Sequence, residues 1–244
     1  MFRLEAVSLV KSACAKAITI LSEINIELQP QSITALIGPS GAGKSSLIRL
    51  LNRLDDPTSG TVYFQDNQLA SFNVLKLRRQ IGMVFQMPVM FPGTVGENIH
   101  YATRFQKIEP SQLKTARALL TMVGLDPDLE ERRADQLSIG QQQRVSLART
   151  LATNPEVLLL DEPTASLDPT SALEIMQLIR SLQSQLGLTV ILITHLLSQA
   201  KTYSDFTAYL ETGRLIEYGP TELLFTTPQH PEVRNFLAKG EIGA

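Results

Sequence analysis

The sequence has no tryptophan and only one cysteine, Cys14, among its 244 residues. A single cysteine cannot form a disulfide within the chain, which is typical of proteins from a reducing compartment. No uninterrupted apolar run approaches the roughly 18–20 residues that a membrane-spanning helix needs. The first ten residues, MFRLEAVSLV, contain no basic segment followed by a long apolar one. We therefore expect a cytoplasmic chain that is held at a membrane only through a partner.

An excess of charge of either sign is also missing. The 22 lysines and arginines nearly balance the 24 aspartates and glutamates, giving a formal net charge of −2. A chain this close to neutral has no general attraction for nucleic acid or anionic lipid, and no local basic cluster is visible in the sequence. We therefore expect no nucleic-acid partner. The apolar share of 43% is sufficient for the core of one large domain.

The pattern of apolar residues separates two kinds of strand. Period-two alternation predicts half-exposed strands at 3–10 and 18–28. Continuous apolar runs predict buried strands, of the kind found in parallel sheets, at 32–37, 81–85, 156–160 and 189–194. Helical spacing lies between these runs, at 44–52, 111–123, 141–153 and 169–186. This alternation of buried strands and helices predicts an α/β fold with a mostly parallel sheet.

Segment 87–154 breaks this alternation, because it is almost wholly helical after a loop that contains proline and glycine. We interpret it as a helical subdomain inserted into a single domain, 1–244, whose catalytic core consists of 1–86 and 155–244. Beyond the last buried strand the pattern predicts three smaller elements: a hairpin turning at Thr212–Gly213 and short helices near Thr221 and Pro231.

The stretch IGPSGAGKSSL has the spacing Gly38-x-x-x-x-Gly43-Lys44-Ser45 between a predicted strand and a predicted helix. Glycines let the backbone turn its N–H groups toward an anion, and the helix N-terminus adds partial positive charge. Lys44 can neutralise the β- and γ-phosphates of ATP, and the Ser45 hydroxyl can bind the Mg²⁺ that bridges them. A glycine-rich turn with a solvated lysine is the alternative, but this setting favours a phosphate loop. Its predicted nucleotide-binding residues are Gly38, Pro39, Ser40, Gly41, Ala42, Gly43, Lys44, Ser45 and Ser46.

Two carboxylates end the predicted strand EVLLL, at the sheet edge where parallel α/β proteins bind ligands. We expect Asp161 to hold Mg²⁺ through water, and Glu162 to orient and polarise the water that attacks the γ-phosphate. Solvated acids at a strand end are a plausible alternative for either residue alone. Beside a phosphate loop, the pair is more typical of a nucleotide-hydrolysing site.

Together these motifs resemble the ATP-binding cassette family, the nucleotide-binding subunits of ABC transporters. The resemblance covers nearly the whole chain and includes Gln86 in GMVFQ, LSIGQQQR at 137–144, LLLDEPTASLD at 158–168 and His195 in LITH. It implies a P-loop NTPase core with a mostly parallel sheet, an N-terminal antiparallel β subdomain and a helical insertion. It also implies an ATPase that uses ATP and Mg²⁺.

The stretch LSIGQ is similar to the family signature LSGGQ, with Ile139 in place of the first glycine. Ser138 and Gly140 precede the predicted helix that starts at Gln141, where a hydroxyl and free N–H groups suit a terminal phosphate. The resemblance assigns Ser138, Gly140 and Gln141 to ATP that is bound by a second copy of the chain in a head-to-tail dimer. An ordinary helix cap is the alternative, and it remains a fair interpretation for Gln142 and Gln143.

The resemblance assigns roles to three further residues. Gln86 is expected to contact Mg²⁺ or the attacking water and to sense the partner, and His195 to contact the γ-phosphate and hold the water with Glu162. Asp168 is expected to lie against the opposing subunit and the nucleotide, and a role as N-cap of the helix starting at Pro169 is compatible with this.

One departure from the family concerns the base of the nucleotide. Family members commonly place an aromatic residue after the first strand to stack on adenine, but VSLVKSACAKA has none. We expect Val10 or Lys11 to pack on the ring instead, with weaker binding.

The stretch FQMPVMFPGTVGENI is similar to phosphate-importer ATPases and to related metal-tolerance cassettes. This resemblance implies an importer subunit on the cytoplasmic face of a membrane, with a transmembrane permease and an extracytoplasmic binding protein as further partners. The segment TVGENI and the loop after Gln86 are expected to form the docking surface. The alternatives are an exporter-type cassette, a non-transport ABC ATPase, a P-loop kinase, which the LSIGQ stretch argues against, and a silent binding module, which need not keep Glu162 and His195.

Overall fold

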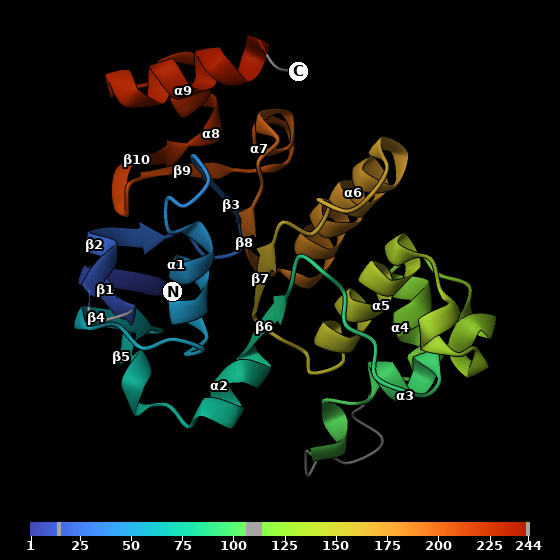
Figure 1. Cartoon of the computed structure of the whole chain (residues 1–244). Coiled ribbons are helices and arrows are strands. Elements are labelled where there is room, and N and C mark those ends of the chain that lie inside the picture. Colours follow the sequence, from blue (N-terminus) through green and yellow to red (C-terminus); the bar gives the residue numbers. More distant parts are fainter. Residues whose placement is uncertain (14–15, 106–113, 243–244) are drawn as a thin grey trace.

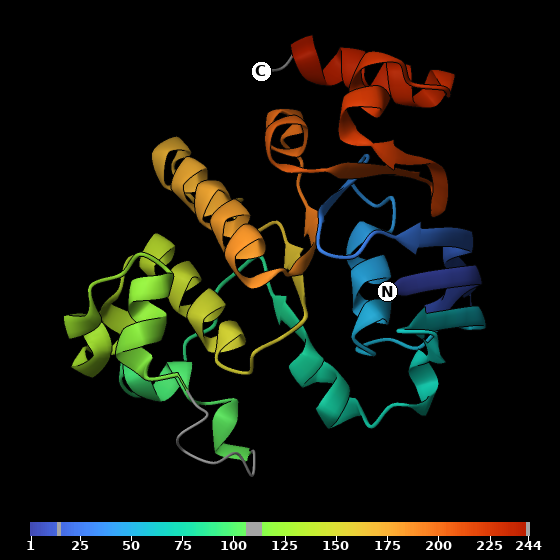
Figure 2. The same ribbon diagram turned by 180° about the vertical axis from the view of Figure 1, so that it is seen from behind.

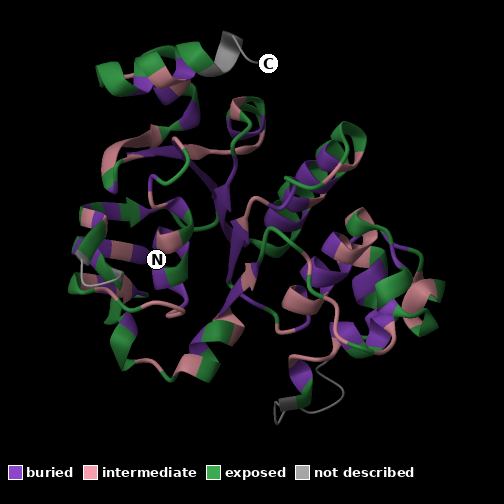
Figure 3. Cartoon of the chain, viewed as in Figure 1, coloured by how far each residue is buried: buried purple, intermediate pink, exposed green. Residues whose placement is uncertain are grey.

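A six-stranded sheet forms the centre of the structure, in the order β10-β9-β3-β8-β7-β6 (Figure 1). The computed structural model describes residues 1–13, 16–105 and 114–242. The strands are β3 (Ile33–Ile37), β6 (Ile81–Val84), β7 (Val157–Asp161), β8 (Thr189–Ile193), β9 (Phe206–Glu211) and β10 (Arg214–Pro220). All pairs are parallel except β9 with β10. The four predicted buried strands are the neighbours β3, β8, β7 and β6, and the middle of the sheet is buried almost throughout (Figure 3). The predicted α/β fold is confirmed.

A second, antiparallel sheet has the order β2-β1-β4-β5. Its strands are β1 (Phe2–Ala13), β2 (Lys16–Leu28), β4 (Ser59–Phe64) and β5 (Asn67–Gln68). Helix α1 (Lys44–Leu51) lies between the two sheets in both views (Figures 1 and 2). Apolar residues from both sheets and α1, among them Phe2, Ile24 and Leu50, share one core. This core fixes the phosphate loop, which leads into α1, against two sheets.

The opposite face of the central sheet is covered by α5 (Ile139–Leu151) and α6 (Pro169–Leu186), which share a second core with β7 and β8. Smaller elements complete the fold: α2 (Val74–Gln80), α3 (Val95–Ile99), α4 (Ala116–Met122), α7 (Leu197–Tyr203), α8 (Thr221–Thr226) and α9 (Pro231–Ile242), with short 3-10 helices at Leu69–Ser71, Thr103–Phe105, Pro127–Glu131 and Ala134–Gln136. In the described part of the chain, no helix has both the length and the apolar character needed to span a bilayer.

Three details differ from the sequence prediction. The helix predicted from Gln141 begins at Ile139, because Ser138 is its N-cap. The helix predicted over 111–123 begins at Ala116 in the described residues, since the Thr115 hydroxyl accepts from Ala118 N, and 106–113 lie outside them. The sequence analysis predicted none of β4, β5, α2 and α7. The predicted hairpin and both short C-terminal helices are confirmed, with Glu211 paired to Arg214.

Candidate functional site

The loop between β3 and α1 adopts backbone conformations that require glycine at two positions. Gly38 has a φ of 142°, and a Cβ there would lie 2.0 Å from the carbonyl oxygen of Leu210 on β9. Gly43 has a φ of 100°, and a Cβ there would lie 2.7 Å from the Leu21 side chain. A residue with a side chain would be strained at either position. The loop is therefore held against β9 and β2 while its N–H groups lead into the N-terminus of α1.

Lys44 is the first residue of α1, and its side chain folds back over the loop. Its Nζ donates to the carbonyl oxygens of Gly38 and Pro39, at 2.8 and 2.9 Å. Burial lowers the pKa of the Lys44 ammonium, and the nearby carboxylates of Glu162 and Asp161 act in the opposite direction. A buried cation at the start of a helix is well placed to meet a phosphate oxygen.

Ser45 and Asp161 bring oxygen ligands together at the end of β7. The Ser45 hydroxyl donates to Asp161 Oδ1 at 3.0 Å, and burial raises the pKa of the Asp161 carboxyl. A hydroxyl and a carboxylate are the hard oxygen donors that Mg²⁺ prefers, with phosphates and water filling the remaining positions. The described residues contain no cluster of three or more histidine, cysteine or acidic side chains that could hold a metal alone. The pair therefore fits a Mg²⁺ ion that arrives with a nucleotide.

Glu162 follows β7 in the left-handed region, with a φ of 50°. Its backbone N–H donates to the carbonyl oxygen of Ile193 at the end of β8, and its Oε1 contacts His195 Nε2. A residue other than glycine in this region carries local strain, which proteins often retain at functional sites. The strained turn and the β8 loop thus bring the two side chains together.

A cavity of about 290 Å³ connects these elements. It is lined by Ile20, Ser40, Gly41, Ala42, Gly43, Lys44, Ser45, Ser46, Glu162 and His195. The sequence analysis missed Ile20. Val10 and Lys11, one of which was expected to pack on the base, do not line this cavity; Val10 is exposed, and Lys11 pairs with Asp55 at 3.0 Å. Ile20 lies at an irregularity in the pairing of β2 with β1, where the register passes from Leu21 to Thr19.

The sequence analysis also missed Gln199. This buried side chain on α7 accepts a hydrogen bond from Thr194, at the end of β8, at 2.8 Å. It also bonds to Thr164, beyond Glu162, at 3.1–3.2 Å. The amide therefore ties the loop after β7 to the loop after β8. A lone glutamine in a short helix gave no signal for this role.

Gln86 lies two residues beyond β6, whose Val84 pairs with Leu160 on β7. This register places Gln86 at the same sheet edge as Asp161 and Glu162. Its side chain is exposed and does not line the cavity. The structure thus places the residue at the expected edge without bringing it into the cavity.

The stretch LSIGQ leads into α5, with Ser138 as the N-cap and Ile139 as the first helical residue. Ser138 Oγ accepts from Gln141 N at 3.3 Å, and Gln141 Oε1 accepts from Ser138 N at 3.0 Å, so the two form a capping box. Gly140 was expected to precede the helix but is its second residue. A Cβ on Gly140 would lie 3.8 Å from the Leu167 side chain, so this turn lies beside the SLD segment.

Asp168 caps α6, and its carboxylate accepts from Ser171 N at 3.0 Å. This confirms the N-cap role. The hydrogen bonds from Ser171 lower the pKa of the Asp168 carboxyl. Asp168 and Ser138 are both exposed, and neither lines the cavity at the phosphate loop. The structure therefore separates the predicted site into two groups on different parts of the chain.

Comparison with known proteins shows which family the chain resembles. The family model described as "ABC transporter" matches residues 21–165. The chain is 45% identical over 231 residues to a protein of Mycobacterium tuberculosis named "Phosphate import ATP-binding protein PstB 2", covering 90% of this chain and 83% of that protein. It is 41% identical over 225 residues to "Protein STAR1" of Oryza sativa subsp. japonica, covering 91% of this chain and 64% of that protein.

Two solved structures share the fold. One is a dimeric, post-hydrolysis state of the ATP-binding cassette MJ0796 bound to ADP and Pi, with a TM-score of 0.81, 32% identity, and coverage of 91% of this chain and 99% of that one. The other is cbiO1 from Clostridium perfringens, part of the ABC transporter complex cbiONQ, with a TM-score of 0.82, 29% identity, and coverage of 99% and 98%. The chain belongs to the ABC transporter family and is one of its ATP-binding, ATP-hydrolysing cassettes.

Proposed function

We propose that two copies of this chain close head to tail on two ATP molecules and thereby drive a membrane-spanning permease. The proposal rests on the separation of the predicted site residues into two groups. Lys44 and Glu162 line one cavity, while the exposed N-terminus of α5, capped by Ser138, lies outside it. A helix N-terminus is suited to an anion, so each group supplies half of a phosphate site. The dimeric relative with bound ADP and Pi supports this arrangement.

Within each half-site we assign separate roles to the side chains of the cavity. Lys44 and the N–H groups of the phosphate loop hold the phosphates, and the Glu162 carboxylate accepts the proton of the attacking water. His195 contacts that carboxylate and fixes its orientation. Ser45 and Asp161, with Gln86 after closure, would hold Mg²⁺, which supplies charge neutralisation between the β- and γ-phosphates when bound. The catalytic core, 1–86 and 155–244, thus supplies the chemistry, and segment 87–154 supplies the covering half-site.

Replacing Ser138 with arginine tests directly whether two copies of the chain share one phosphate site. Ser138→Arg should abolish ATP-dependent dimerisation, because a long cation replaces the cap at a surface that must meet the partner's nucleotide. The measurement is size-exclusion chromatography with light scattering, with and without ATP, in the Glu162→Gln background. Ser181→Arg, on an exposed face of α6, is the matched control and should dimerise normally. Normal ATP-dependent dimerisation of Ser138→Arg would contradict the shared site.

Replacing Ile20 with alanine tests the base-binding surface. We propose that Ile20 packs on the adenine ring, for which this chain has no stacking aromatic residue after its first strand. Ile20→Ala should weaken nucleotide binding by about three- to tenfold, as expected for losing roughly 1 kcal/mol of apolar contact. Isothermal titration calorimetry with ATP and with inorganic triphosphate separates the two parts of the ligand. If binding of triphosphate weakens as much as binding of ATP, Ile20 does not contact the base.

The relatives also support a proposal for the cargo and the location. We propose an importer of a phosphate-like anion, because the 45% identity to a phosphate-import ATP-binding protein extends over 90% of the chain. No residue of this chain need contact the cargo, since the permease and an extracytoplasmic binding protein would select it. The cassette would lie peripherally at the cytoplasmic face, as a permease subunit would hold it there. Purification of the tagged chain from its membranes, followed by identification of the stoichiometric partner, tests this assignment.

A further inference from the structure

Gln199 lies beneath the two loops that carry Glu162 and His195. It belongs to α7, whose first residue, Leu197, is two positions beyond His195. Gln199, Thr194 and Thr164 show only 5%, 4% and 7% of their surface, so their polar groups depend on one another for hydrogen bonds. None of the three lines the cavity at the phosphate loop. Any effect of Gln199 on hydrolysis therefore has to pass through residues that do.

The central sheet stops holding these two loops together just before the two side chains meet. The pairing of β7 with β8 ends at Asp161 and Ile193, and the Glu162 N–H donates to the Ile193 carbonyl oxygen at 3.1 Å. The chain then turns at Glu162, whose φ is 50°. The His195 side chain is 49% exposed, so packing does little to fix it. The contact between Glu162 and His195 therefore depends on how the neighbouring residues are held.

The Thr194 hydroxyl fixes the backbone around His195. Its oxygen accepts from the Leu196 N–H at 3.1 Å, which closes a short turn with His195 at its centre. The same hydroxyl donates to Gln199 Oε1 at 2.8 Å. A hydroxyl has one proton, and donating it to Gln199 leaves a lone pair of the oxygen for the Leu196 N–H. Gln199 thereby sets the orientation of the group that holds the His195 turn.

The Thr164 hydroxyl connects the same amide to the loop after β7. It lies 3.2 Å from Gln199 Oε1 and 3.1 Å from Gln199 Nε2. Thr164 is two residues beyond Glu162, and the Ala165 N–H donates to the Glu162 carbonyl oxygen at 3.1 Å, so Thr164 lies within a tight turn that starts at Glu162. One amide thus bonds to both loops, with an acceptor toward Thr194 and a donor toward Thr164.

We propose that Gln199 is a positioning residue for ATP hydrolysis, because its amide holds the His195 turn and the chain beyond Glu162 at a fixed separation. This inference rests on the proposed function, in which Glu162 accepts the proton of the attacking water. A side chain without polar atoms at position 199 would leave both threonine hydroxyls buried without their partner. The His195 turn would then move relative to Glu162, and the contact that orients the Glu162 carboxylate would weaken. A small displacement of a catalytic group is enough to slow a reaction.

Gln199→Met tests the proposal, since methionine has nearly the same length as glutamine but lacks the amide. Steady-state phosphate release by the full chain should give a kcat about tenfold lower than that of the unmodified chain. The KM for ATP should stay within about twofold, because Lys44 and the phosphate loop are unchanged. A residue that only stabilises the fold would lower the melting temperature without separating kcat from KM in this way.

A pair of substitutions at Thr194 covers the case in which Gln199→Met does not fold. Thr194→Val has the shape of threonine without the hydroxyl, and it should also lower kcat about tenfold. Thr194→Ser keeps the hydroxyl that bonds to Gln199 and Leu196, so its kcat should lie within about twofold of that of the unmodified chain. Recovery by serine assigns the effect to the hydrogen bonds of the hydroxyl.

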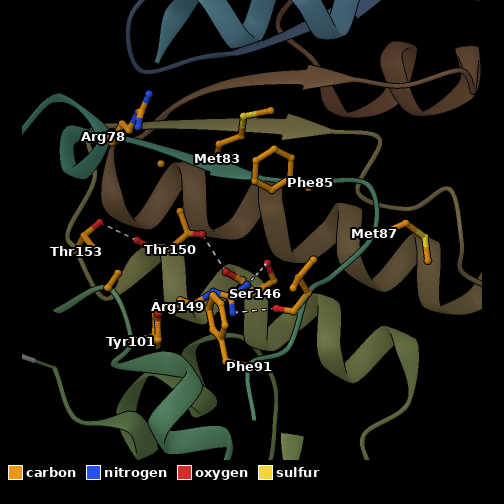
Figure 4. Close-up of a pocket in the computed structure, with 13 residues that line it drawn as sticks. Arg78, Met83, Phe85, Met87, Phe91, Tyr101, Ser146, Arg149, Thr150 and Thr153 are labelled. Carbon is orange, nitrogen blue, oxygen red and sulfur yellow. Dashed lines mark hydrogen bonds between the residues drawn. The ribbon is translucent and has the colours of Figure 1, made fainter. Parts of the chain in front are cut away.

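Two threonine hydroxyls far from the cavity provide matched controls. The buried hydroxyls of Thr207 on β9 and Thr221 on α8 share a hydrogen bond of 2.8 Å. Thr153 lines a groove of about 340 Å³ beside α5, and its hydroxyl donates to the carbonyl oxygens of Thr150 and Arg79 at 3.0 and 3.1 Å (Figure 4). Thr207→Val and Thr153→Val should lower the melting temperature while kcat stays within about twofold. A loss of kcat in either control comparable to that in Thr194→Val would overturn the proposal.

The effect of Gln199 should also depend on the carboxylate that it positions. In the Glu162→Gln background, whose slow residual hydrolysis is measured at high enzyme concentration, adding Gln199→Met should lower the rate by less than about twofold. Three results would overturn the proposal: an unchanged kcat in folded Gln199→Met, an equal loss in Thr194→Ser and Thr194→Val, or a loss of about tenfold that persists in the Glu162→Gln background. Normal turnover of Glu162→Gln alone would instead refute the proposed function, so the two failures are distinguishable.

Discussion

A Glu162→Gln variant should hydrolyse ATP at least about a hundredfold more slowly than the unmodified chain while binding ATP with similar affinity. A general base contributes about 10²–10⁴-fold to a hydrolytic rate. The amide has nearly the shape of the carboxylate and can still contact His195, but it cannot accept a proton from water. Because the phosphate loop is unchanged, we expect ATP-bound dimers to accumulate. Phosphate release and size-exclusion chromatography measure the two effects.

The same strand offers a control for this variant. Glu156 precedes β7 at its opposite end, where its carboxylate accepts from Gln65 and from Gln80, at 2.5 and 3.1 Å. Glu156→Gln removes the same charge from the far edge of the sheet, so it should leave the rate of hydrolysis within about twofold of the unmodified chain, as is usual for surface changes. Unimpaired turnover in Glu162→Gln would refute the role assigned to Glu162.

The sequence was sufficient for the parts of the site that depend on one local pattern. Gly38 and Gly43 need a conformation that other residues resist, and this need is readable from their spacing alone. The acids at the end of β7 follow from a buried run that ends in Asp161 and Glu162. In each case a single element determines where the side chains lie, so the strand–loop–helix context was enough.

Other parts depend on contacts between distant segments, and the sequence could not reveal them. Ile20 reaches the cavity because β2 passes the phosphate loop, and the Lys11 ammonium bonds to Asp55, 44 residues along the chain. Asn98 on α3 accepts from Phe91 N at 2.8 Å and donates to Phe91 O at 3.0 Å, and nothing in the sequence showed that this asparagine is buried. Helix α2 was missed because seven residues show too little periodicity for an assignment.

A Lys44→Ala variant should bind ATP about ten- to a hundredfold more weakly, which corresponds to the loss of charge-assisted hydrogen bonds worth about 1.5–3 kcal/mol. The substitution removes the cation closest to the predicted phosphate position. Alanine suits the first turn of α1. Lys44 lines the cavity, so water can take the place of its ammonium beside the Gly38 and Pro39 carbonyl oxygens, and the fold should remain intact. Calorimetric titration with ATP measures the affinity, and thermal unfolding followed by circular dichroism checks the fold.

Arg49→Ala provides the comparison that makes the Lys44 result specific. Arg49 lies on the same helix, carries the same charge and pairs with Asp55 at 3.0 Å, but it does not line the cavity. If net charge alone governed binding, the two variants would lose similar affinity. If Lys44 holds the phosphates, only Lys44→Ala should bind weakly, and the difference should persist at high salt because the site is partly shielded from ions. Equal ATP affinity of Lys44→Ala and the unmodified chain would remove the phosphate-binding role from the loop's only lysine.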